Sequence, residues 1–155
     1  ASDVYKRQFG HLVAGPTTLL DPQGEGMVGS AVRDSAVVSA AQAAGLSVET
    51  VAELVALAED GNSGAKTILR ERAVVLGEAI SSLVSLLNPT RVVLGGQAFT
   101  DSPETLSLVA SIARQNAKGL DIRVTAARGR VQQQAAAAVA ITAVANDPLQ
   151  VMNKK

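Results

Sequence analysis

The sequence predicts an α/β domain, because helical and strand-like patterns alternate along it and one short strand ends in two glycines. Residues 88–97 read NPTRVVLGGQ. Pro89 ends the preceding helix, since proline has no N–H to donate and drives Asn88 out of the α region. The apolar residues that follow predict a parallel strand covered by helices on both faces. Gly95 and Gly96 remove side chains at the carboxyl end of that strand, where open α/β sheets hold ligands.

The residues before this strand predict a strand end, a loop and a series of helices. Residues 9–13 predict the end of a strand, and the glycines and prolines of residues 17–29 predict a long loop. Apolar residues at helical spacing then predict one amphipathic helix over residues 30–44. Ser47 or Thr50 can cap the next predicted helix, and Thr50 and Glu53 stand at the spacing of a capping box.

The longest predicted helix begins at Ser63 and leads into the central strand. Gly77, in its middle, costs about 1 kcal/mol relative to alanine, so we expect another backbone to approach closely there. Three elements follow the strand: a helix that starts at Ser102-Pro103-Glu104 and runs to about Gly119, a strand over residues 122–126 nearer the sheet edge, and an alanine-rich closing helix over residues 132–145.

Composition limits the class of protein. The 155 residues are 47% hydrophobic and 18% charged, which favours one folded domain over disorder, and no apolar run has the length of a membrane span. Fourteen basic and fourteen acidic residues give a net charge of zero, so we expect no nucleic-acid binding by this chain alone. The absence of cysteine excludes disulfides and fits a cytoplasmic protein.

The first residues predict a foreign segment. Residues 2–8 read SDVYKRQ, which the DNA string TCAGATGTGTATAAGAGACAG encodes. That string resembles the transposase end sequence used to build sequencing libraries. We therefore expect residues 1–8 to be a non-native scar and residues 9–155 to form a single lobe whose upstream half has been cut away. The alternative is an ordinary polar leader.

Three motifs in series resemble a known family. Leu76-Gly77-x-x-Ile80, then Leu86-Leu87-Asn88-Pro89, then Val92-Val93-Leu94-Gly95-Gly96 are similar to the C-terminal half of the ROK family, which groups sugar-responsive transcriptional repressors with sugar kinases. The resemblance covers about residues 9–145. It implies the C-terminal lobe of an actin-like, RNase H-like ATPase fold, left incomplete by truncation at the N-terminus.

The resemblance also implies candidate sugar contacts. His11 is the only histidine of the chain, and Gly10-His11 is similar to the end of the family's Glu-x-Gly-His motif. The resemblance therefore implies a sugar-facing or structural role for His11. The glutamate of that motif falls on Gln8, inside the expected scar. Glu25 is similar to a later sugar-binding glutamate, although a solvated loop acid remains the alternative. The cysteines of the family's zinc motif are absent, so we expect no zinc.

Gly95 and Gly96 resemble the family's adenosine-side motif, in which backbone N–H groups let a nucleotide approach. The alternative is that this turn persists as architecture alone. The family's Asp-x-Gly-x-Thr phosphate segment and catalytic aspartate do not occur in this chain. We therefore expect the chain itself to phosphorylate nothing and to hold no cofactor; ATP and magnesium enter only if the whole protein is a kinase.

Two functions follow from the resemblance. The favoured one is a fragment of a sugar-sensing transcriptional regulator, because most bacterial sugar kinases of the family carry the zinc cysteines. The alternative is a fragment of an ATP-dependent, glucokinase-like sugar kinase, and a third is a lobe whose ligand site has decayed. For the regulator we expect a sugar or sugar derivative as ligand, DNA contact through a missing N-terminal domain, no membrane, and a homo-oligomer at full length. The sequence leaves the identity of the sugar open.

Overall fold

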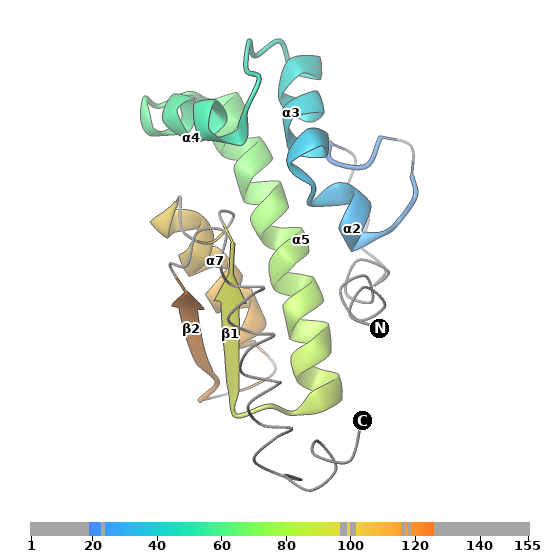
Figure 1. Cartoon of the computed structure of the whole chain (residues 1–155), viewed down its shortest axis with the longest axis vertical. Coiled ribbons are helices and arrows are strands. Elements are labelled where there is room, and N and C mark those ends of the chain that lie inside the picture. Colours follow the sequence, from blue (N-terminus) through green and yellow to red (C-terminus); the bar gives the residue numbers. More distant parts are fainter. Residues whose placement is uncertain are drawn as a thin grey trace, which may run out of the picture.

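A computed structural model describes residues 19–22, 24–96, 99, 102–115, 117 and 119–125. The expected strand over residues 9–13, the closing helix over residues 132–145 and the expected scar lie outside these residues. The elements, in chain order, are α2 (Val28–Ala31), α3 (Asp34–Ala43), α4 (Val51–Glu59), α5 (Ser63–Leu87), β1 (Arg91–Gly95), α7 (Pro103–Ala113) and β2 (Asp121–Thr125). Figure 1 shows α5 as the central rod, with α2 and α3 on one side and the two strands on the other.

The ends of α5 are set by asparagines. The side chain of Asn62 accepts a hydrogen bond from the backbone N–H of Ala65 at 3.0 Å, which caps the first turn. Asn88 ends the helix in the left-handed region, with φ 44° and ψ 51°, and its N–H donates to the Val84 carbonyl at 2.8 Å. The prediction that Asn88 leaves the α region before Pro89 is confirmed.

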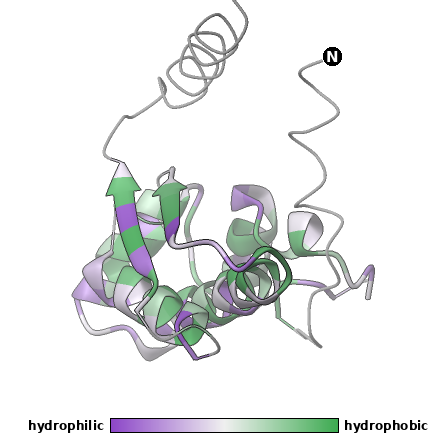
Figure 2. Cartoon of the chain, turned by 90° about the horizontal axis from the view of Figure 1, so that it is seen from below, coloured by the Kyte–Doolittle hydropathy of each residue, from purple (hydrophilic) through white to green (hydrophobic). Residues whose placement is uncertain are grey.

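The two strands pair in parallel, with Arg91 opposite Asp121 and Gly95 opposite Thr125. Side chains alternate between the two faces of the sheet, and Figure 2 shows this alternation of polar and apolar residues along β2. Leu94 is buried against the cluster formed with α5 and α7, whereas Val93 is 61% exposed. The prediction of a strand buried on both faces is therefore wrong for the described residues, because α5 and α7 cover the same face.

Gly77 lies where α7 crosses α5. A Cβ atom added to Gly77 would lie 2.8 Å from the Cβ atom of Ile112, closer than such atoms approach in proteins. The expected close approach is confirmed, although the group that approaches is the Ile112 side chain rather than a bare backbone. The absence of a side chain at Gly77 lets the two helices pack.

The predicted single helix over residues 30–44 is wrong in one respect. The structure has the short α2 and then α3, separated at Val32 and Arg33, and the backbone of Arg33 is extended. The carbonyl of Val32 accepts hydrogen bonds from the Arg72 side chain in α5 instead of continuing a helical ladder. The predicted loop over residues 17–29 is also shorter than expected, because α2 already begins at Val28. At the other end of the fold, α7 ends at Ala113, earlier than the predicted end near Gly119.

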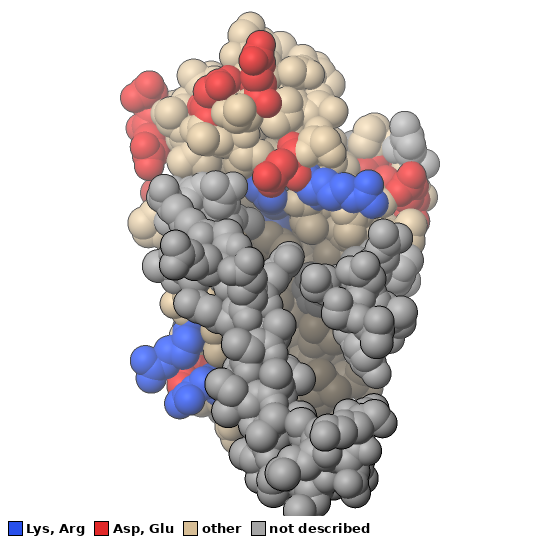
Figure 3. All heavy atoms as spheres, viewed as in Figure 1, with Lys and Arg blue, Asp and Glu red and all other residues tan. Residues whose placement is uncertain are grey.

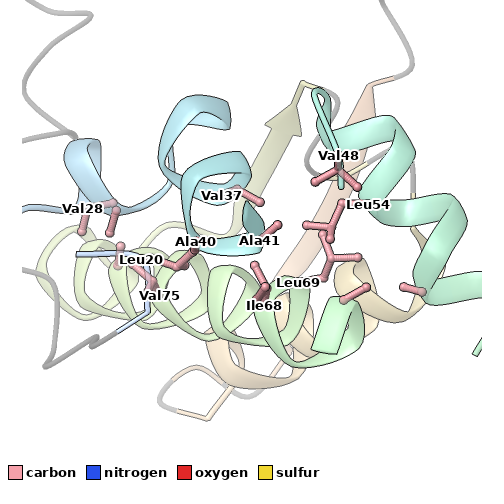
Figure 4. Packing of buried hydrophobic residues seen from close by; sticks show 14 residues of the cluster. Leu20, Val28, Val37, Ala40, Ala41, Val48, Leu54, Ile68, Leu69 and Val75 are labelled. Atoms are coloured by element: carbon pink, nitrogen blue, oxygen red, sulfur yellow. The ribbon is translucent and has the colours of Figure 1, made fainter. Parts of the chain in front are cut away.

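Two apolar clusters hold these elements on α5. Figure 4 shows one of them, in which side chains from the turn before α2, from α2, α3 and α4 and from the first half of α5 meet. Leu20 is buried there, whereas Leu19 is 39% exposed. The second cluster joins the other half of α5 to α7 and the sheet. No helix in the described part of the chain is long and apolar enough to cross a membrane.

Candidate functional site

Glu25 lies in a tight turn before α2. The carboxylate of Asp21 accepts hydrogen bonds from the backbone N–H groups of Glu25, at 3.0 Å, and of Gly26, at 2.7 Å. Gly24 and Gly26 both have φ of +67°, a conformation that favours glycine. The Glu25 carboxylate in turn accepts a hydrogen bond from the Ser30 hydroxyl. The turn thus holds an exposed carboxylate and a hydroxyl together at the start of α2.

This carboxylate lines a groove of about 500 Å³ along α3. Leucine and alanine side chains line the groove together with polar and charged side chains that include Glu25, Ser30 and Arg33. Carboxylate and hydroxyl groups hydrogen-bond sugar hydroxyls, while apolar side chains suit the C–H faces of a sugar ring. The groove therefore has the chemistry of a site for a small polar ligand.

His11, the other predicted sugar contact, lies outside the described residues, so its position relative to Glu25 stays a prediction. The same holds for the prediction of no zinc. No group of three or more histidine, cysteine or carboxylate side chains that could bind a metal occurs in the described part of the chain.

Gly95 and Gly96 lie at the carboxyl end of β1, as predicted. Gly95 pairs with Thr125 and ends the strand, while Gly96 has φ of +118° and open space where a Cβ atom would be. The carbonyl of Gly96 accepts a hydrogen bond from the N–H of Phe99 at 3.1 Å. The φ angle alone requires glycine at position 96, so the turn is consistent both with ligand approach and with architecture alone.

The chain leads from this turn to α7, whose first turn borders a second cavity of about 670 Å³. Ser102 caps α7, because its hydroxyl accepts a hydrogen bond from the N–H of Thr105 at 3.3 Å. Lys66 and Arg70 of α5 also line this cavity. Its lining combines acidic, basic, hydroxyl and apolar side chains: Val55, Ala58, Glu59, Lys66, Leu69, Arg70, Ser102, Pro103, Glu104, Thr105 and Leu108.

Arg72 is a functional candidate that the sequence analysis missed. It is only 7% exposed, although it carries a charge. Its Nε and Nη2 atoms donate to the Val32 carbonyl at 3.1 and 2.8 Å, and Nη2 also donates to the Asp34 carboxylate at 2.5 Å. The available signal is an arginine inside the apolar stripe of α5, next to Leu69 and Ala73. A buried cation requires such partners.

The amino-acid sequence of this chain is similar to those of known transcriptional regulators. The chain is 40% identical over 140 residues to transcriptional regulator Rv0485 of Mycobacterium tuberculosis and to transcriptional regulator Mb0495 of Mycobacterium bovis, a match over 81% of this chain. The chain spans about a third of the length of these relatives, since the match covers 32% of each.

Two solved structures share its mixed α/β fold. A ROK hexokinase from Thermus thermophilus matches with a TM-score of 0.64 and 25% identity, over 79% of this chain and 43% of the hexokinase. A ROK family transcriptional regulator, described as a homolog of the Escherichia coli MLC protein, matches with a TM-score of 0.60 and 19% identity, over 75% of this chain and 33% of the regulator. The fold is thus one that both enzymes and regulators use.

The family model of ROK proteins matches residues 25–147. This chain belongs to the ROK family.

Proposed function

We propose that this chain is part of the ligand-binding lobe of a sugar-responsive transcriptional regulator. The observation that carries the proposal is the 40% identity with the mycobacterial regulators, which extends over 81% of the chain. The identity with the hexokinase is lower, at 25%. Because one fold hosts both activities, this difference in sequence, and not the fold, favours the regulator.

The turn at Glu25 supplies the chemistry of ligand recognition in this proposal. Its carboxylate accepts hydrogen bonds, and each hydrogen bond to a charged group contributes about 1.5–3 kcal/mol. The bond from Ser30 and the two N–H groups that bind Asp21 fix the turn before a ligand arrives, which lowers the entropy lost on binding. His11 completes the sugar site from the segment upstream.

The longer protein, in this proposal, has an actin-like fold whose other lobe forms the opposite wall of the sugar cleft. DNA contact comes from a segment outside these 155 residues. Two observations support this assignment. The net charge is zero, and Figure 3 shows basic side chains close to acidic ones on the face that it draws. We further propose that the longer protein forms a homo-oligomer in the cytoplasm.

The test uses the intact gene. The full-length protein is expected to bind DNA upstream of its own operon, and one sugar from a panel is expected to change that affinity. Glu25→Gln removes the carboxylate charge and is expected to weaken the sugar response about 10-fold or more, equivalent to about 1.4 kcal/mol. Glu78→Gln is the matched control, because Glu78 is an exposed acid of α5 outside the grooves described above. An unchanged sugar response in Glu25→Gln would exclude Glu25 from the site.

A sugar kinase is the second candidate, and the match to the Thermus hexokinase favours it. In that case the Gly95-Gly96 turn and the cavity at the start of α7 would hold the nucleotide of ATP with magnesium, and the upstream lobe would supply the general base. Phosphorylation of a sugar by the full-length protein in the presence of ATP would select this function. Absence of such activity, together with DNA binding, would exclude it.

A further inference from the structure

A groove of about 650 Å³ lies between α3 and the start of α4, on the other flank of α3 from the Glu25 groove. Ser35 and Ser39 form the ridge between the two grooves, since they line both. The α4 side is formed by its cap residue Thr50 and the first turn. The lining residues are Asp34, Ser35, Val38, Ser39, Glu49, Thr50, Val51, Ala52 and Arg72.

Arg72 brings a buried hydrogen-bond donor to this groove. A guanidinium has five N–H groups, and the Nε and Nη2 atoms of Arg72 use theirs on Val32 and Asp34. The Nη1 atom makes no hydrogen bond or ion pair with any residue in the described part of the chain. The Arg72 side chain is 8% exposed and lines the groove. The groove thus offers a donor that an acceptor would satisfy.

The other polar groups of the groove determine which ligand fits. The Asp34 side chain is 64% exposed, and Glu49 is exposed as well. The hydroxyls of Ser35 and Ser39 make no hydrogen bond to another described residue. Two carboxylates against one guanidinium disfavour an anion, and two carboxylates are too few for a metal site. A neutral molecule with several hydroxyl groups fits, because each hydroxyl both donates and accepts.

We propose that this groove binds a neutral polyhydroxylated molecule, such as a monosaccharide or a related polyol, at a site separate from Glu25. Hydroxyl oxygens of the ligand accept a hydrogen bond from Nη1 of Arg72, and its hydroxyl groups donate hydrogen bonds to the carboxylates of Asp34 and Glu49. Val38, Val51 and Ala52 contact the C–H groups of the ligand. The site does not depend on the regulatory function proposed above, because no residue of it is needed for DNA binding.

The test fills the groove without touching its hydrogen bonds. Ala52 is an exposed residue of α4 that lines the groove, so Ala52→Trp places an indole in it. Ala56→Trp is the matched control, because Ala56 is exposed on the same helix and outside the groove. Binding of glucose, sorbitol and inorganic phosphate to the full 155-residue chain is measured by calorimetry. Glucose or sorbitol is expected to bind the wild type and Ala56→Trp equally, and Ala52→Trp about 10-fold or more weakly.

Further variants separate this site from the Glu25 groove. Glu49→Gln, which leaves the packing intact, is expected to weaken polyol binding several-fold, and Glu25→Gln is expected to leave it unchanged. Polyol binding that Ala52→Trp leaves intact would overturn the proposal, as would binding that only Glu25→Gln abolishes. Failure of both polyols to bind the wild type, or binding of phosphate instead, would also overturn it. These results leave the DNA-binding test of the proposed function unaffected.

Discussion

Gly77→Ala tests whether the crossing of α5 and α7 depends on a missing side chain. An alanine Cβ would lie 2.8 Å from Cβ of Ile112 and 3.1 Å from both Cγ2 and Cδ1. The first contact is attached directly to the α7 backbone, so α7 itself must move. Overpacking of this kind costs about 1–3 kcal/mol, and we expect the upper end. Alanine gains about 1 kcal/mol in helix propensity, which leaves a net loss of about 2 kcal/mol.

Urea unfolding with linear extrapolation measures this loss. Gly64→Ala is the control in the same helix, because a Cβ atom there would meet only the end of the Asn62 side chain at 3.3 Å and Leu46 at 3.8 Å. We expect it to change stability by about 1 kcal/mol or less. Ile112→Ala in the Gly77→Ala background removes two of the three close atoms and should recover part of the loss. A Gly77→Ala variant as stable as the wild type would refute this explanation of the crossing.

Three further predictions concern polar contacts. Arg72→Met leaves the Val32 carbonyl without its donors and is expected to cost about 2–4 kcal/mol in unfolding free energy, whereas Asp34→Asn, at an exposed carboxylate, costs about 1 kcal/mol or less. Thr50→Ala removes the cap of α4, a loss of about 1 kcal/mol that helix content and urea melts would report. The hydrogen bond from Arg91 lowers the pKa of Asp121, so this carboxylate stabilises the fold above its unfolded pKa of about 3.9 and loses that contribution as the pH falls through the folded pKa. Asp121→Asn should therefore flatten the acid side of the stability profile, and an unchanged profile would contradict the pairing.

Local signals predicted three helix boundaries: the start of α4, the end of α5 and the start of α7. Thr50 caps α4, and the proline after Asn88 ends α5, because the groups that decide these ends lie within a few residues of each other. The start of α7 at Pro103, after its Ser102 cap, was predicted for the same reason.

Contacts between distant residues were not predicted. The break between α2 and α3 depends on a hydrogen bond from Arg72 to Val32, which is 40 residues away in the sequence. The exposure of Val93 likewise depends on which face of the sheet the helices cover. The pattern of apolar residues within one strand does not predict which face that is.

The candidate site was predicted in part. Glu25 was proposed through a family resemblance. The hydrogen bonds around it were not predicted, because the N–H groups of Glu25 and Gly26 reach the Asp21 carboxylate only in a turn whose glycines have positive φ. The groove between α3 and α4 was not anticipated at all. Asp34 and Arg72, two of its lining residues, form an ion pair although they are 38 residues apart in the sequence, and no spacing in the sequence signals that contact.

DNA binding by the full-length protein, measured by fluorescence anisotropy with and without sugars, tests the regulatory assignment most directly. We predict binding to DNA upstream of its own operon, a change in affinity with one sugar, and no sugar phosphorylation with ATP. Sugar-dependent ATP turnover without specific DNA binding would contradict the assignment and identify the protein as a kinase.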